Sequence, residues 1–554
     1  VFGSTANGNP SEHMPLANRV YERVRGWSAT TLGGIAGSPR MELATRRDGT
    51  PAPIRQVDHF GRFTAAAGHR LYTARAYPRE YWNRTAFVCE PTGHVVATFQ
   101  LAPRGAGFSS RMAWDLLASD DEWTAPIAAE VGPDGQVWVV DWYNYIVQHN
   151  PTPAGFENGK GNAYETPLRD TSHGRIWRVV HGENEASALR DLGNASDAAL
   201  VAMLADTNLF WRSRAQRTLV ERVARLEGAD RAAAITAVTP ALLALVRDRD
   251  VDEIGLAPGA IHALWTLSNL GLVHEGADIG LLDTVRRALE HPSAGVRMNA
   301  VRVLPRDEAT LVAIDRARIP ADPSALVRLA LLETLSECAP GDLAGDLVLR
   351  LLRDRRTLED PVLADAATAA AAVQAGRVLP DLLGGTKAAV RALTSVLPAI
   401  LVADAPPSPR LLDIIGRVAE HVARGGDPEA LATVLVEAAG ADEASAAAAL
   451  AGLARGWPKG RKADLPAAAE EAIVALVGKL PAAAQGELVS LVQHTGSRVL
   501  DEHVGRISEA LFGDLDRPDA EDDARGDAAR RLVSLRPADA GLVADLLERV
   551  GGRN

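Results

Sequence analysis

The sequence predicts a multidomain protein of mixed β and α class, rich in strands at its start and in helices afterwards. Two observations lead to this prediction. All 7 tyrosines precede residue 165, and 7 of the 10 tryptophans and 7 of the 9 phenylalanines precede residue 180. After residue 180 alanine and leucine dominate. Because aromatic and β-branched residues suit strands while alanine and leucine favour helices, we expect one domain over 1–182 and another over 183–554.

The first part consists of short strand-like runs separated by glycine, proline and asparagine. The runs cover residues 70–76, 85–90, 94–102, 136–141 and 175–180. Gly132-Pro133-Asp134-Gly135 has the composition of a tight hairpin turn. Such evenly spaced strands indicate a sandwich, barrel or propeller. At about 40–50 residues per four-stranded blade, this part predicts roughly three to four blades of a partial β-propeller. An open ring exposes blade edges, so we expect missing N-terminal sequence or a partner to cover them.

The second part repeats a helix-pair pattern. An apolar residue, an arginine, two further residues and an alanine or apolar residue recur at 211–215, 296–300, 327–331 and 390–394. Related units without the arginine lie at 261–265 and 363–367. Their spacing, roughly 27 to 50 residues, is typical of degenerate HEAT-type repeats. We therefore expect a HEAT-like α-solenoid over 183–554.

Composition excludes several classes of function. The net charge is −12 and no block of lysine and arginine is present, so nucleic acid or an anionic membrane is not an expected partner. The sequence contains no run of 18 apolar residues, so it predicts no transmembrane segment. Cys89 and Cys338 lie far apart and outside any CxxC motif, which predicts two buried thiols and no zinc, disulfide or haem c site. The chain starts without an initiator Met or signal peptide, so we expect a processed N-terminus or a fragment.

Polar and aromatic residues gather near the predicted strand ends. The candidates for function are His59, Arg62, Glu90, His94, Asp121, Trp123, Asp141, Tyr143, Asn144 and His149. Histidine can act as a general base near neutral pH, and tryptophan or tyrosine faces stack on sugar or quinone rings. Each residue also has a structural interpretation. The histidines suit loop hydrogen bonds, Asp121 suits a turn or cap, and Trp142 and Tyr143 suit packing between blades.

Five stretches resemble the propeller of a known family, the planctomycete-type membrane-bound dehydrogenase and haem-binding (CxxCH) family. They are Tyr81–His94, Gly132–Gly135, Asp141–Asn144, His149–Pro151 and His173–Arg178. The resemblance covers nearly all of residues 1–182. It implies a sorbosone/glucose-dehydrogenase-like propeller, a HEAT-like region and a C-terminal cytochrome c module. This chain departs from the family in having no CxxCH motif, hence no haem c within it, and in lacking the N-terminal blades.

The resemblance implies an exported or periplasmic oxidoreductase, as a subunit or fragment. Its propeller would oxidise a sugar-like alcohol or aldehyde with pyrroloquinoline quinone and calcium, passing electrons to a cytochrome c module or protein acceptor. The candidate roles are His59 or His94 as base, Arg62 or Asn144 as orienting group, Asp121 as calcium ligand, and Glu90, Trp123, Asp141, Tyr143 and His149 as binding residues. The alternative is a non-catalytic propeller and HEAT scaffold that binds carbohydrate or protein partners.

Overall fold

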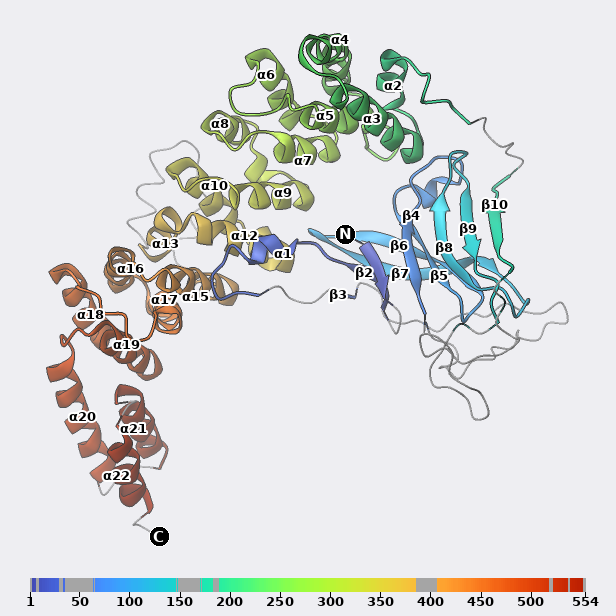
Figure 1. Ribbon diagram of the computed structural model, residues 1–554. Helices are drawn as coiled ribbons and strands as arrows, with labels where there is room; N and C mark the ends of the chain where they lie inside the picture. The colour runs from blue at the N-terminus through green and yellow to red at the C-terminus, as the bar shows by residue number, and fades with distance from the viewer. Residues whose placement is uncertain are drawn as a thin grey trace. The chain divides into compact units, whose positions relative to one another are not determined.

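The structure is a computed structural model that describes residues 2–5, 9–28, 33–34, 63, 65–145, 147, 170, 172–182, 189–384, 406–517, 522–536 and 539–551. The chain divides into two compact units. The first comprises Val1–Pro15, Thr30–Pro305 and Asp322–Ala330. The second comprises Leu16–Ala29, Arg306–Ala321 and Leu331–Asn554. The last described strand ends at Val179 and the next helix begins at Asp197, so the architecture changes within the first unit (Figure 1).

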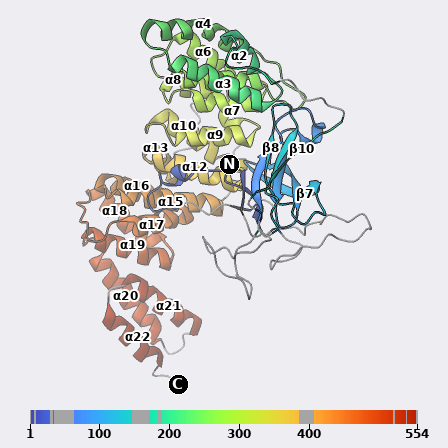
Figure 2. The ribbon, with the colours of Figure 1, turned by 45° about the vertical axis from the view of Figure 1, so that its right-hand side comes forward.

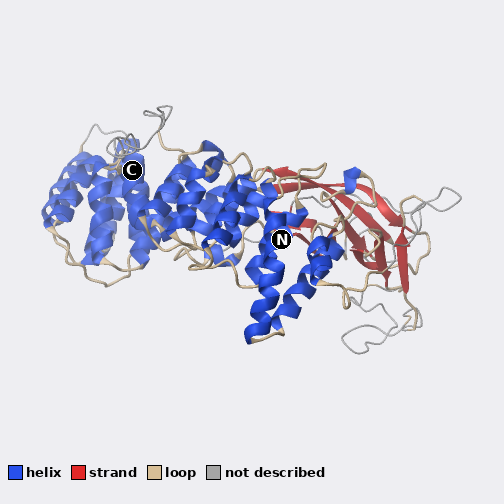
Figure 3. Ribbon diagram, turned by 90° about the horizontal axis from the view of Figure 1, so that it is seen from above, coloured by secondary structure: helices blue, strands red, loops and turns tan. Residues whose placement is uncertain are grey.

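Three antiparallel sheets lie in the first unit (Figures 1 and 3). The first contains β1 (Phe2–Thr5), β2 (Asn9–His13) and β3 (Gly33–Gly34). The second is a meander of β4 (Ala67–Leu71), β5 (Thr85–Glu90), β6 (Val95–Arg104) and β7 (Gly107–Ala118). The third contains β8 (Pro126–Val131), β9 (Val137–Asp141) and β10 (Arg175–Val179). The predicted strand at 85–90 is confirmed to the residue, whereas β7 was not predicted.

The two larger sheets pack face to face around one apolar core. Alternate side chains of both sheets point into it, as the period-2 geometry of strands requires. Its members include Tyr72, Phe87, Val96, Val131 and Val139, none more than 5% exposed. Cys89 belongs to the same core as a free thiol, and burial raises its pKa to about 12. This cysteine is a small apolar core residue, as predicted.

The predicted hairpin joins β8 to β9. Gly135 donates to the Gly132 carbonyl at 3.0 Å, and its φ of 74° is one that glycine adopts without strain. The Asp134 side chain accepts from the Gln136 amide at 3.1 Å. The hairpin prediction is therefore confirmed, with the strands paired from Val131 opposite Val137.

The helices of the first unit dock on this hairpin through the start of α3 (Leu209–Ala224). Asn208 caps that helix by accepting from the Phe210 amide at 3.0 Å. Its amide group also donates to the carbonyls of Gly132 at 2.8 Å and Pro133 at 3.3 Å. Trp211 adds a bond from Nε1 to the Pro133 carbonyl at 2.8 Å. The carbonyl groups of the hairpin turn thus also bind the start of α3.

The remaining helices of the first unit stack in order of sequence. They are α2 (Asp197–Met203), α4 (Gly228–Arg247), α5 (Pro258–Asn269), α6 (Ile279–Arg287) and α7 (Ala294–Val303), with α3 between α2 and α4. Each contacts its second neighbour: α2 with α4, α3 with α5, α4 with α6, and α5 with α7 (Figure 2). Second-neighbour contacts are the pattern that stacked helix pairs produce.

The arginine of the repeat pattern has a structural role. Arg212 is 4% exposed and donates to the Asp206 carbonyl at 2.6 Å, and burial lowers its pKa to about 10. Arg297 donates to the His291 carbonyl at 2.8 Å and to both carboxylate oxygens of Asp322 at 2.7 and 3.0 Å. In both helices the arginine ties the helix to the turn beside it.

The second unit consists of helices in the described residues. They are α1 (Asn18–Tyr21), α8 (Glu308–Arg316), α10 (Asp342–Leu352), α11 (Arg355–Glu359), α12 (Pro361–Val373), α13 (Ala375–Leu383), α15 (Pro409–Arg424), α16 (Pro428–Gly440), α17 (Glu443–Gly456), α18 (Ala467–Lys479), α19 (Ala482–Thr495), α20 (Asp501–Asp516), α21 (Asp522–Leu535) and α22 (Ala540–Gly551), while α9 (Ala325–Leu335) crosses the division. Second neighbours again touch, as in α15 with α17 and α16 with α18. The predicted repeat at 390–394 lies outside the described residues.

One described helix is long and apolar enough to span a membrane. It is α4, with 20 residues, and the bent pair of α12 and α13 passes the same test only if taken as one span. The sequence predicted no such segment. Contacts of α4 with α2, α5 and α6 make it a member of the helical stack.

The docking bonds of Asn208 predict a measurable contribution to stability. We expect Asn208→Ala to lower the free energy of unfolding of the first unit by about 2–4 kcal/mol, because it removes a helix cap and two further hydrogen bonds to the hairpin carbonyls. The matched control is Ser196→Ala, which removes only the cap of α2 and should cost about 1 kcal/mol. Urea unfolding of the full chain measures both values, and equal losses would contradict the docking role.

His262 predicts an acid sensitivity of the first unit. Its ring contacts Gln216 Oε1 at 2.7 Å, and burial lowers its pKa to about 4 from an ordinary 6.5. Between these values the unfolded chain binds a proton that the folded chain does not, so stability falls as pH drops from 6.5 towards 4. We expect His262→Gln to flatten this dependence. Unfolding midpoints measured at pH 7 and pH 5 check this, and an unchanged slope would contradict it.

Candidate functional site

The candidate site lies at one end of the β8–β10 sheet. There Asp141, the last residue of β9, pairs with Pro126 of β8 and Arg175 of β10. Polar and aromatic side chains from these strands and the adjoining loops come together at this point. We call them the end cluster: Asp121, Trp123, Thr124, Asp141, Tyr143, Tyr145, Arg175 and Trp177.

Asp141 is the centre of the end cluster. It is 1% exposed, and four donors surround its carboxylate. Oδ1 accepts from the backbone amides of Ala125 at 2.7 Å and Tyr143 at 2.9 Å. Oδ2 accepts from Arg175 Nε at 3.0 Å and Trp177 Nε1 at 2.9 Å. The residue therefore joins the ends of all three strands instead of facing an open cavity.

Arg175 uses every side of its guanidinium group within the cluster. Besides Asp141, it donates to Asp121 Oδ2 at 2.9 Å and Thr124 Oγ1 at 2.8 Å. Its planar face lies 4.0 Å from the centre of the Tyr143 ring and 5.0 Å from that of Trp177. Sequence reasoning did not select Arg175. The signal that could have found it is its position on the strand that pairs with β9, directly opposite Asp141.

Aromatic rings form the outer side of the end cluster. The Trp123 ring centre lies 5.8 Å from Tyr143 and 5.5 Å from Tyr145. His173 meets the Tyr143 ring edge-on at 6.5 Å, and its side chain is 71% exposed. His173 Nδ1 lies 2.5 Å from Asp170 Oδ2. Hydrogen bonds from Ser172 and His173 lower the pKa of Asp170 to about 2. The result is a partly exposed aromatic surface bordered by a carboxylate and an imidazole.

The opposite end of the same sheet repeats the central arrangement. Asp134 accepts from Trp138 Nε1 at 3.1 Å and from Arg178 Nε at 2.6 Å. Burial opposes ionisation there, but hydrogen bonds from Trp138 and Arg178 hold the pKa of Asp134 below its usual value. An aspartate bound to an arginine and an indole thus closes both ends. This combination of aspartate, arginine and tryptophan therefore has a structural role in the sheet. The Asp141 end differs from the Asp134 end by its aromatic surface.

Three other predicted residues, Glu90, His94 and Asn144, are buried. Glu90 is fully buried, and its carboxylate accepts from the Ala65 amide at 3.1 and 3.2 Å. His94 is 7% exposed, with a φ of 57°, and its Nδ1 is bonded to the Thr124 carbonyl. A carbonyl only accepts, so this bond places the proton of His94 on Nδ1. Asn144 is also buried, at 4% exposed.

Three of the predicted site residues, His59, Arg62 and His149, lie outside the described residues. The structure therefore brings together Asp121, Trp123, Asp141 and Tyr143, with His94 attached through Thr124.

The described residues of the end cluster do not fit calcium. Asp121 Oδ2 is occupied by the Arg175 guanidinium and Oδ1 accepts from the Trp123 amide. A second cation beside that guanidinium would be repelled, and calcium needs six or more oxygen ligands. Among the described residues, no group of three or more potential side-chain ligands is found. The two carboxylates also neutralise Arg175, so it offers no free charge to an anionic quinone. We derive no step through either group.

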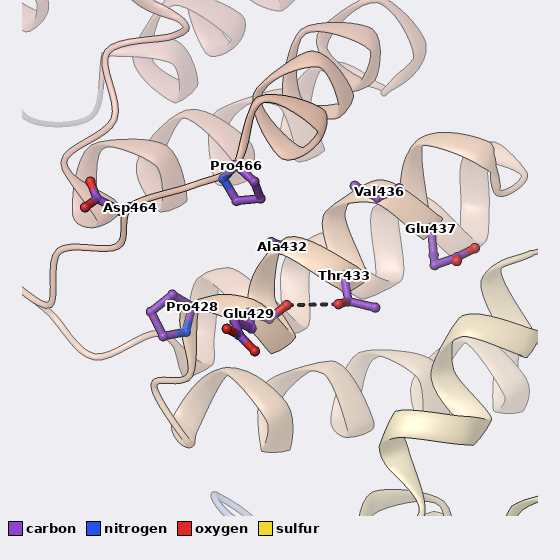
Figure 4. A pocket seen from close by; sticks show the side chains of 8 residues that line it. All are labelled: Pro428, Glu429, Ala432, Thr433, Val436, Glu437, Asp464 and Pro466. Carbon is purple, nitrogen blue, oxygen red and sulfur yellow. Dashed lines mark hydrogen bonds between the residues drawn. The ribbon is translucent and has the colours of Figure 1, made fainter. Parts of the chain in front are cut away.

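A separate groove lies in the second unit. It has a volume of about 400 Å³, and α16 and the segment just before α18 supply its walls (Figure 4). Glu429, Glu437 and Asp464 make its lining acidic, and Thr433 bonds back to the Glu429 carbonyl at 2.9 Å. No predicted site residue belongs to it.

Comparisons with known proteins identify one family match. Residues 1–183, which contain all the strands described above, match a family described as "Domain of unknown function (DUF7133)". No curated protein matches the chain. Among solved structures, the complex of CpcE and CpcF of phycocyanin lyase from Nostoc sp. PCC7120 is 19% identical and covers 54% of this chain and 98% of its own. Its TM-score of 0.24 is too low for any structural inference.

The four bonds to Asp141 predict a large stability effect at this site. We expect Asp141→Asn to lower the free energy of unfolding by about 2–4 kcal/mol, since the half-buried Arg175 loses its fully buried charge partner. The control is Asp120→Asn in the exposed turn nearby, which should change stability by about 0.5 kcal/mol or less. Chemical unfolding followed by tryptophan fluorescence measures both variants. A similar small effect for both would contradict the central role of Asp141.

Proposed function

We propose that the protein is a non-catalytic scaffold whose end cluster binds a carbohydrate. In this proposal the sheets are part of a β-propeller and the helices are a HEAT-like solenoid. The carrying observation is that the charged groups at the strand end bind one another, while the aromatic rings around them are partly exposed. Such a site presents an aromatic surface to a ligand, and its charged groups hold the rings in position.

The propeller part of the proposal is supported by the packing of the sheets. Two antiparallel meanders, successive in sequence, lie face to face, as neighbouring blades do. The outer face of the β8–β10 sheet exposes Val140 at 42% and its strand partner Ile176 at 68%. An apolar sheet face of this kind suits contact with another sheet. The HEAT-like part is supported by the second-neighbour contacts and the buried repeat residues Ala215 and Ala300.

The chemistry of the partly exposed rings favours a sugar as the ligand. The apolar faces of sugar rings stack on tryptophan and tyrosine, which here are Trp123, Tyr143 and Tyr145. Asp170 and His173 at the border can exchange hydrogen bonds with ring hydroxyl groups. Arg175 holds the Tyr143 ring in place before binding, which lowers the entropic cost of association.

An exported oxidoreductase acting on similar sugars is the second candidate. The observation that favours it is the bond of His94 Nδ1 to the Thr124 carbonyl, which leaves Nε2 as the basic nitrogen of that ring. In this candidate His94 would accept a hydroxyl proton, and a cytochrome c domain or partner protein would receive the electrons.

The scaffold proposal predicts a specific loss of sugar binding. We expect Trp123→Ala to weaken binding of the best oligosaccharide from an array by about tenfold or more, because a stacking face is removed. Trp114→Ala is the matched control, since Trp114 is 38% exposed on β7 and its indole contacts Tyr81. Calorimetry measures the dissociation constants, and equal effects of the two variants would reject the end cluster as the site.

The same oligosaccharides distinguish the two candidates when they are tested for dye reduction. The scaffold proposal predicts no turnover with the wild-type chain, with or without added quinone and calcium. Turnover that His94→Ala abolishes, in a variant that still unfolds like wild type, would establish the oxidoreductase instead.

A further inference from the structure

A short segment near the N-terminus belongs to the second unit. Leu16–Trp27, which we call the strap, contains α1 and two hydrogen-bonded turns, from Val24 to the Tyr21 carbonyl and from Trp27 to the Val24 carbonyl. Leu16, Val20 and Val24, spaced four residues apart, are each 2% exposed. A four-residue helix cannot bury these side chains by itself, so the surrounding helices must cover them.

The strap lies on a surface formed by α12 and α15 of the second unit. Helix α1 contacts α12, and Tyr21 Oη donates to Asp365 Oδ2 at 3.2 Å (Figure 1). The Arg25 amide donates to His421 Nδ1 at 2.9 Å, and Arg25 Nη1 donates to the His421 carbonyl at 3.2 Å. The Arg417 guanidinium lies 5.2 Å from the centre of the Trp27 ring. Specific polar bonds thus accompany the apolar contact at both ends of the strap.

The strap is basic, and a carboxylate of the second unit, Glu337, lies next to its arginines. Arg19, Arg23 and Arg25 against Glu22 give the strap a net charge of 3 − 1 = +2. Arg19 and Arg23 lie 3.5 and 3.8 Å from Glu337 Oε1. The strap thus combines an aliphatic stripe with two arginines that lie close to Glu337, a residue between α9 and α10.

Gly26 marks the closest approach of the strap to α15. Its φ is 84°, and a Cβ there would lie 2.6 Å from Glu420 Oε1 and also against Arg424. A side chain at this position would press against the ends of Glu420 and Arg424, so glycine favours the close approach.

We propose that the surface of α12 and α15 is a binding site for basic amphipathic segments of partner proteins, and that the strap occupies it in cis. The strap is a linear peptide held by side-chain contacts, hence it is a template for an external ligand of the same chemistry. Attachment to the same chain gives it an effective concentration in the millimolar range, so a partner segment must displace it. This inference does not depend on the sugar-binding proposal.

A competition experiment on the full chain tests the proposal. The probe is a fluorescent peptide of residues 14–28, titrated against the wild-type chain and the Val20→Asp/Val24→Asp variant. We expect the variant to bind at least tenfold more tightly, because its own strap no longer fills the site. A peptide with the same two substitutions should bind neither chain. Equal affinity for both chains, or no binding to a variant whose second unit unfolds like wild type, would overturn the proposal.

Two glycine substitutions, Gly26→Ala and its control, give an independent test by amide hydrogen exchange. Gly26→Ala should raise amide exchange across residues 18–27 at least tenfold, because the new Cβ meets Glu420 and Arg424. Gly276→Ala is the matched control, since Gly276 has a φ of 81° but no neighbour within 4 Å of the added Cβ. If residues 18–27 exchange alike in both variants, the strap is not held by this surface.

Discussion

The buried carboxylate of Asp141 is the interaction on which the end of the β8–β10 sheet depends. It binds one amide from the start of β8, one amide just beyond β9, and the side chains of Arg175 and Trp177 from β10. The arrangement satisfies a charge that would be costly to bury alone. It also sets the position of Arg175, which in turn supports the Tyr143 ring. The partly exposed aromatic surface is therefore a consequence of an interior ion pair.

The opposite end of the sheet shows which part of this arrangement is structural. Asp134, Arg178 and Trp138 make the same contacts without an adjoining aromatic surface. A polar cluster at a strand end thus has two separable layers. The inner layer closes the sheet, and the outer layer consists of partly exposed rings. This separation explains why several residues with the chemistry of an active site, such as Asp121 and Glu90, are bonded to the protein itself.

Local features of the fold could be predicted from the sequence, because short-range chemistry determines them. The Gly132–Gly135 hairpin and strand 85–90 follow from turn residues and a β-branched and aromatic run. Arg175 was missed because its partner Asp141 lies 34 residues earlier, and pairing of β9 with β10 is a tertiary choice. The strap was missed for the same reason: Tyr21 and Asp365 are 344 residues apart. The helix pattern also did not predict that each compact unit is built from several separate segments of the chain.

A double-mutant cycle between Asp141 and Arg175 tests the central claim most directly. The free energies of unfolding of the wild type, Asp141→Asn, Arg175→Met and the double variant are measured under one set of conditions. Because the two groups are in contact and share neighbours, we predict a coupling of about 1–3 kcal/mol. Additive effects, within about 0.3–0.5 kcal/mol, would show that the pair does not organise the end cluster.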